Sequence, residues 1–136
     1  MSSWRAEAIA RLPEHRQMIE QSDGLMALWI ELCSLFERAY RTPLDADLIR
    51  RIYDFARWCS QRPRVNDPGN DPLTCVCCAF FEHIPTILAA RRDMHRWFSV
   101  GDVLASKGVF SYLIGDDDFE NLVAEMRAAG QASAKH

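Results

Sequence analysis

The chain has 136 residues, of which 49% are hydrophobic and 26% are charged, and this length suits one domain with a single core. With 16 basic and 19 acidic residues the net charge is −3, so we expect neither nucleic acid nor an anionic membrane as a partner. The amino-terminal sequence MSSWRAEAIARLPEHRQ lacks the apolar segment of a signal peptide, and no apolar run reaches the roughly 20 residues that span a bilayer. These features predict a cytoplasmic protein.

Glycine and proline number six each and fall at a few points, while the apolar residues between them recur at helical spacing. This pattern predicts an all-α fold, a single compact domain of about six to seven helices. We divide the chain into an amino-terminal helical extension at 1–22, interrupted by Pro13, a helical core domain at 23–130 and a frayed tail at 131–136.

The clearest helix is expected from Asp23 to Tyr40, because its apolar residues share one face and Pro43 follows. A second amphipathic helix begins at Asp45 and ends before the segment QRPRVNDPGNDP, which reads as a cluster of turns.

A third helix is predicted from Pro72 to residue 84, with Asp71 as its cap. We expect it to pack against the helix at 23–40 in the centre of the protein.

The last third of the chain contains two further helix signals. Ser99 is expected to cap a helix that runs to about Lys107 and is interrupted by Gly108. Asp117 and Glu120 match an Asp-x-x-Glu capping pattern at the start of a final helix, which we expect to fray after residue 130.

The segment LTCVCCAFFEHIP, residues 73–85, holds three of the five cysteines. A structural zinc site needs four convergent ligands, and the only Cys-x-x-Cys pair lies in a predicted helix without a second pair, so we expect no metal. A redox switch at Cys75, at the start of that helix, is left as an alternative. The segment is instead predicted to form an apolar stripe in the core, which consists of Leu73, Val76, Cys77, Phe80 and Ile84. Cys78 and Phe81 are expected to extend this stripe.

Glu82 and His83 follow eight uncharged residues and are candidates for an acid and base pair. Adjacent helical residues diverge by about 100°, so we expect both to be structural polar residues. An enzyme or ligand-binding protein would need Glu31, Glu82 and His83 to line a pocket, with an arginine at 57 or 96 binding an anion. No glycine-rich phosphate-binding motif is present, and we expect no cofactor.

Charge is distributed unevenly along the chain, and two groups are candidates for binding another protein. The preferred group combines the acidic residues of the last helix with an aromatic residue, and it consists of Asp116, Asp117, Asp118, Glu120 and Trp97. The alternative group is basic and consists of Arg50, Arg57, Arg62 and Arg64.

Three segments, LWIELCSLFERAY, LIRRIYDFARWCSQRPR and FFEHIPTILAARRDMHRWF, carry a Trp-x-Glu-Leu, an Ile-Tyr with a Trp-Cys, and a Glu-His-x-Pro in that order. Over residues 28–126 the chain thereby resembles a family of small bacterial helical proteins that are similar to toxin-immunity proteins. The resemblance implies a non-catalytic cytoplasmic protein that neutralises a cognate toxin, with a secreted antibacterial toxin domain as its partner. An enzyme and an adaptor in an oligomeric assembly are the alternatives, and the sequence leaves the oligomeric state open.

Overall fold

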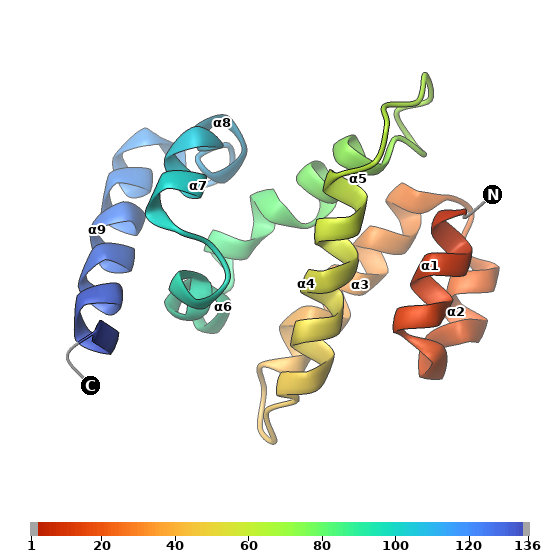
Figure 1. Ribbon diagram of the computed structural model, residues 1–136, viewed down its shortest axis with the longest axis horizontal. Helices are drawn as coiled ribbons and strands as arrows, with labels where there is room; N and C mark the ends of the chain where they lie inside the picture. The colour runs from red at the N-terminus through yellow and green to blue at the C-terminus, as the bar shows by residue number, and fades with distance from the viewer. Residues whose placement is uncertain (1–2, 135–136) are drawn as a thin grey trace. The chain divides into compact units, whose positions relative to one another are not determined.

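The computed structural model describes residues 3–134, and over that range the chain is all-α without a strand, as predicted (Figure 1). The chain divides into two compact units that meet in the sequence between Phe80 and Phe81. Unit 1 contains α1 (Trp4–Arg11), η1 (Pro13–His15), α2 (Arg16–Gln21), α3 (Leu25–Ala39), α4 (Ala46–Ser60) and α5 (Pro72–Ala79). Unit 2 contains η2 (Phe81–Thr86), α6 (Leu88–Asp93), η3 (Met94–Arg96), α7 (Val100–Ala105), α8 (Lys107–Phe110) and α9 (Gly115–Ala134). The elements written η are 3₁₀ helices.

The core of unit 1 is a cluster of aromatic rings between α3, α4 and the end of α5. The Trp29 ring lies between those of Phe55 and Phe80, with centroids 5.2 and 5.0 Å away, and Phe36 meets Phe80 edge-on at 4.8 Å. All four side chains are fully buried, and aromatic pairs in these geometries add to the stabilisation that burial provides. The predicted packing of the helix at 23–40 against the helix that begins at Pro72 is confirmed.

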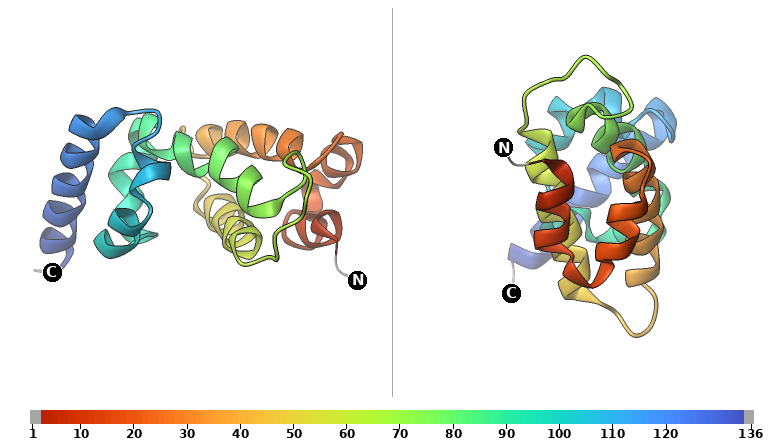
Figure 2. Two further views of the ribbon diagram at one scale, coloured as in Figure 1. Left: turned by 90° about the horizontal axis from the view of Figure 1, so that it is seen from above. Right: turned by 90° about the vertical axis from the view of Figure 1, so that its right-hand side faces the viewer.

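The amino-terminal segment packs as part of unit 1. Helices α1 and α2 lie side by side (Figure 2), and Pro13 breaks the helix between them as predicted. The Arg5 guanidinium donates to the carbonyl oxygens of Ile19 at 2.6 Å and Ser22 at 2.7 Å. It thereby supplies hydrogen-bond donors to carbonyl groups at the carboxyl end of α2 that have no partner within the helix. Arg51 of α4 donates to the carbonyl oxygen of Arg11 at 2.9 Å and so joins α4 to α1.

The loop that precedes α5 supplies the missing cap of α3. Gly24 occupies the N-cap position of α3 and has no side chain to accept a hydrogen bond. The Leu25 amide donates instead to Oδ1 of Asn70 at 3.1 Å, and the Met26 amide donates to the carbonyl oxygen of Gly69 at 3.1 Å. A Cβ atom on Gly24 would lie 3.1 Å from Asn70 Oδ1, so glycine leaves room for this cap. The segment that reads as a cluster of turns therefore stabilises a helix 45 residues away.

Asp71 holds the same loop against the start of α5. Its buried carboxylate accepts hydrogen bonds from Oγ1 and the amide of Thr74, from the Val65 amide at 2.9 Å and from Nε of Arg64 at 2.7 Å. These donors, the Thr74 hydroxyl foremost, lower the pKa of Asp71 to about 2. The prediction of Asp71 as a helix cap followed by Pro72 is confirmed.

The predicted α-helix over 72–84 is wrong beyond Ala79. Phe80 leaves the helical conformation, with φ −131° and ψ −67°, and the chain continues as the 3₁₀ helix η2. Pro85 lies inside η2 and lacks the amide hydrogen that a continued α-helix would need, but the break at Phe80 comes before the carbonyl that this proline affects. The two consecutive phenylalanines consequently belong to different cores: Phe80 packs in unit 1, and Phe81 meets Phe98 in unit 2 at 5.9 Å.

The predicted core stripe of the cysteine segment also differs from the structure. Of the predicted stripe, Val76, Phe80 and Ile84 are buried as expected, whereas Leu73 and Cys77 are half-buried. Of its predicted extension, Phe81 is half-buried and Cys78 is exposed, while Cys75 and Ala79, which were not part of it, are buried. The face that α5 packs on α3 and α4 therefore includes Cys75 and Ala79 in place of Leu73 and Cys77.

Unit 2 is built around a second aromatic cluster and a long last helix. Phe110 meets Phe98 at 5.2 Å and Phe81 at 6.2 Å, and α9 packs against α6, η3 and α7. Ser99 caps α7 in a capping box, as its position predicts, although α7 ends at Ala105 and Gly108 lies inside α8.

The limits of α9 differ from those predicted at both ends. It begins at Gly115, so Asp117 lies within the first turn instead of capping the helix. It continues through Gly130 to Ala134, because one exposed glycine costs a helix only about 1 kcal/mol. Residues 135–136 of the predicted frayed tail lie outside the described residues.

Within residues 3–134, no single helix is long and apolar enough to cross a bilayer. Among the described residues, the consecutive segments Pro72–Thr86 and Leu88–Arg96 pass that test of length and composition when they are taken together.

Candidate functional site

The acidic residues that the sequence singles out lie in the first turns of α9, but they have different surroundings. Asp118 accepts two hydrogen bonds from Arg91, at 2.8 and 3.0 Å, and Glu125 binds the same guanidinium at 2.8 Å. The Arg91 side chain is only 11% exposed, and the two carboxylates, Asp118 first, raise its pKa. Arg91 in turn lowers the pKa of Asp118. Asp118 therefore joins α6 to α9 and contributes to the fold.

Asp116, Asp117 and Glu120 are exposed on the same helix. The nearest cation to Asp116 is Lys107, whose Nζ is 4.0 Å from Oδ1, and this ammonium also lies 5.8 Å from the centre of the Phe119 ring. An exposed ion pair at that distance contributes little stability. These three carboxylates are thus available to a partner, unlike Asp118.

Directly before these carboxylates, a turn exposes two large apolar side chains. Tyr112 is 72% exposed and Leu113 is 45% exposed, between the buried Phe110 and the start of α9. The turn is held at its base by the Gly115 amide, which donates to the Ser111 carbonyl oxygen at 2.7 Å. Gly115 has φ +85°, a conformation in which other residues are strained, so glycine is needed to connect the turn to α9. We call Tyr112, Leu113, Asp116 and Asp117 the turn surface.

A shallow apolar groove of about 310 Å³ runs between α7 and α9, which lie near each other in Figure 1. Leu104, 46% exposed, is the exposed apolar residue on its α7 wall, and Phe119 and Val123 form its α9 side. Its other lining residues are Lys107, Glu120, Ala124 and Arg127. We call this the α7–α9 groove.

Most of the alternative basic group is engaged within unit 1. Arg50 pairs with Asp47 at 2.7 Å and Asp54 at 2.9 Å, and Arg64 pairs with the buried Asp71. The remaining two arginines differ from each other.

Arg62 places its guanidinium 4.7 Å from the centre of the Trp58 ring. Arg57 is exposed and makes no ion pair with a described residue. The acidic group therefore has three exposed carboxylates, of which only Asp116 has a cation nearby, whereas in the basic group only the Arg57 side chain makes no ion pair, hydrogen bond or ring contact with a described residue.

Trp97, the aromatic member of the preferred group, is half-buried. Its indole Nε1 donates to Asp93 at 3.3 Å, so it is a less accessible anchor than Tyr112. Sequence reasoning missed Tyr112 and Leu113, although the apolar run VFSYLI that leads to a glycine and three aspartates was visible.

The residues of the enzyme alternative are distributed over both units. Glu31 belongs to unit 1, whereas the half-buried Glu82 and His83 lie side by side in sequence on η2 of unit 2. Glu82 and His83 line neither of the two pockets described in unit 2.

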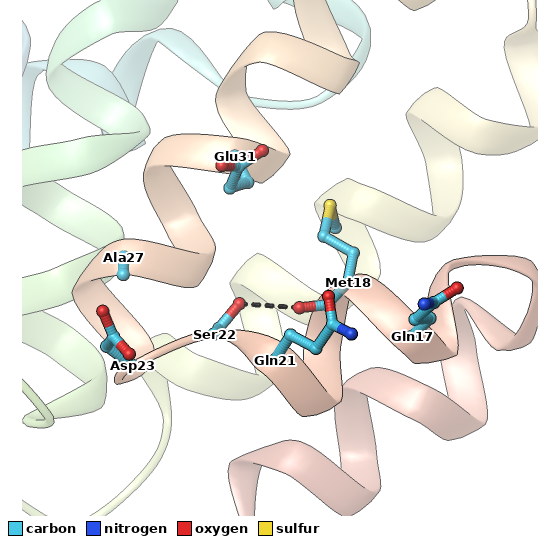
Figure 3. A pocket seen from close by; sticks show the side chains of 7 residues that line it. All are labelled: Gln17, Met18, Gln21, Ser22, Asp23, Ala27 and Glu31. Carbon is cyan, nitrogen blue, oxygen red and sulfur yellow. Dashed lines mark hydrogen bonds between the residues drawn. The ribbon is translucent and has the colours of Figure 1, made fainter.

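Glu31 lines an open depression of about 510 Å³ between α2 and α3 (Figure 3). Two acidic side chains, Asp23 and Glu31, stand on one wall, and the Ser22 hydroxyl donates to the Met18 carbonyl oxygen at 2.9 Å on the other. The other lining residues are Gln17, Gln21 and Ala27. The depression thus contains carboxylates without a histidine, cysteine or arginine that would complete an acid and base pair.

No group of three or more potential metal ligands comes together within residues 3–134. Burial, and then the charge of Asp71, raises the pKa of Cys75 to about 11. The thiol is therefore protonated near neutral pH, which argues against the redox switch considered at this position.

Comparisons with protein-family models, with curated proteins and with solved structures gave no match to this chain.

Proposed function

We propose that the protein is a non-catalytic cytoplasmic binding protein that neutralises a cognate bacterial toxin, and that the turn surface is its contact region. The observation that carries the proposal is the combination of an exposed tyrosine and leucine with two exposed carboxylates on one turn and the start of the helix that follows it. Tyrosine is enriched among the residues that dominate binding energy, and it loses little conformational entropy on binding.

Charge identifies the kind of toxin that this surface fits. Asp116 and Asp117 complement a basic active site, such as one that handles a nucleotide or a nucleic acid. Tyr112 and Leu113 would be buried beside that site and exclude water from the ion pairs. An inhibitor of this kind needs a rigid scaffold and a complementary surface, and no chemistry of its own.

Co-expression with the product of the neighbouring open reading frame tests the proposal in cells. A toxin encoded there should arrest growth alone, and the native chain should relieve the arrest. The variants Tyr112→Ala and Asp116→Lys/Asp117→Lys should lose at least about tenfold in affinity for the purified toxin and should protect poorly. Both change exposed side chains, so both variants should stay folded. The two lysines oppose the dipole at the start of α9 and should lower the melting temperature slightly.

Leu44→Ala is the matched control, since Leu44 is 61% exposed on unit 1 and should be dispensable. Full protection by both turn-surface variants would contradict the proposed contact region. If Glu82→Gln or His83→Ala abolished protection in a folded protein that does not bind the toxin, the enzyme alternative would replace the proposal.

A further inference from the structure

One face of α9 carries opposite charges a short distance apart with small apolar residues between them. Glu120, Val123, Ala124 and Arg127 follow one another along the α7–α9 groove, because residues three, four and seven apart share a helix face. Glu120 and Arg127 are exposed, and neither makes a hydrogen bond or an ion pair with any residue in 3–134. Seven residues separate them by about 10 Å along the helix axis, which is too far for the two to pair.

The charges along this stripe are complementary to those of a second copy of the same stripe that runs in the opposite direction. In two antiparallel copies related by a two-fold axis between Val123 and Ala124, each residue before the axis faces the residue equally far after it. Glu120 then faces Arg127 of the second copy, Arg127 faces Glu120 of the second copy, and Val123 faces Ala124 of the second copy. We propose that the protein forms a homodimer in which α9 packs antiparallel against α9 of a second copy.

The groove provides the space that this arrangement needs. Ala124 is exposed and small, so a second helix can approach α9 closely at the axis. On the other wall, Leu104 is 46% exposed and is covered by the second copy's helix. The contact is isologous, so the second copy's groove receives α9 in the same way and both leucines are buried. A helix of 20 residues, about 30 Å long, presents enough length for this contact.

Charge on the first turns of α9 supports the same occupant. Asp116 and Glu120 are four residues apart on one face, where like charges repel each other in an isolated helix. Arg127 of the second copy relieves that repulsion, and antiparallel helices also bring opposite ends of their dipoles together. The dimer does not depend on the proposed function, since the turn surface precedes the stripe in the chain.

Sedimentation equilibrium of the full chain, from about 1 to 200 μM, tests the proposal. The native chain should reach twice its 15.6 kDa mass as concentration rises. Glu120→Arg and Arg127→Glu each replace both ion pairs of the dimer by like-charge contacts, so each should raise the dimer dissociation constant at least about tenfold. An equimolar mixture of the two variants restores both pairs and should dimerise again, as should the double variant Glu120→Arg/Arg127→Glu.

Arg57→Glu is the matched control, because it reverses an exposed arginine on unit 1 and should leave the dissociation constant unchanged. Circular dichroism of each variant checks that the helices are retained. A native chain that stays monomeric to about 200 μM would overturn the proposal, as would a dimer that both single variants leave intact. If the groove variants failed to bind the toxin while the native chain stayed monomeric, the groove would belong to that partner instead.

Discussion

Removing the Asn70 side chain tests whether a loop supplies the N-terminal cap of α3. Asn70→Ala deletes the oxygen that accepts the Leu25 amide at 3.1 Å, and Gly24 offers no replacement. Loss of an N-cap side chain typically costs about 1 kcal/mol. The exposed hydrogen bond from Asn70 Nδ2 to Asp67 at 2.9 Å is lost as well, and it contributes about 0.5 kcal/mol. We therefore expect unfolding in urea to require about 1–2 kcal/mol less free energy than in the native chain.

A second substitution distinguishes the cap from a general effect on the loop. In the native chain, Gly24→Ser should be neutral or destabilising, because its Cβ would lie 3.1 Å from Asn70 Oδ1. In the Asn70→Ala background the same change should stabilise, since a serine hydroxyl at the N-cap position accepts the free amides of the first turn. The two substitutions should therefore be strongly non-additive.

Amide hydrogen exchange gives the local measurement. The Leu25 amide should exchange faster in Asn70→Ala and slow again in the double variant. Asn66→Ala, at an exposed position of the same loop, is the control and should change neither stability nor exchange. Equal effects of Asn70→Ala and Asn66→Ala, with an unchanged Leu25 amide, would refute the cap.

Three further outcomes are expected. Phe80→Ala removes a fully buried ring and should lower the unfolding free energy by about 3–5 kcal/mol in urea titrations; a loss below about 1 kcal/mol would contradict the aromatic core. Asp71 has its pKa lowered to about 2, so its stabilising effect is complete above about pH 5 and is lost progressively as pH falls through about 4 towards 2; the stability difference between the native chain and Asp71→Asn should therefore shrink over that range, and a constant difference would argue against it. Cys75 should react with a thiol reagent at pH 8 far more slowly than the exposed Cys78, as mass spectrometry of the labelled peptides would show; equal rates would contradict its burial.

The sequence was sufficient for the helical fold and for most helix starts. Asp45, Asp71 and Ser99 precede regular helices and cap them, and such local hydrogen bonds leave a pattern in adjacent residues. The cap from Asn70 to α3 left no such pattern, because it joins residues that are distant in the chain. The end of α5 was missed for a different reason: the apolar spacing continues past Ala79, and no glycine or proline at residues 79–81 indicates that the α-helix ends there.

For the candidate site, residue type alone identified the charged groups but not their availability. Asp118 looks like its two neighbours in sequence, and only the position of Arg91 shows that it is part of the fold. Tyr112 was not predicted as a site residue, because an apolar run is expected to be buried. In the structure the turn before Gly115 exposes the Tyr112 side chain.

The junction between Phe80 and Phe81 limits how the chain can be cut into working fragments. Domain boundaries usually fall in flexible, exposed linkers, which proteases cleave and which tolerate inserted sequence. Here the boundary is a single peptide bond, and the residues on its two sides are anchored in separate cores. A fragment that ends before Phe80 lacks part of the first aromatic cluster, and one that starts after Phe81 lacks part of the second. Limited proteolysis should therefore spare this bond in the native protein. An insertion between Phe80 and Phe81 would pull at least one of the two rings out of its core, because no linker residue separates them.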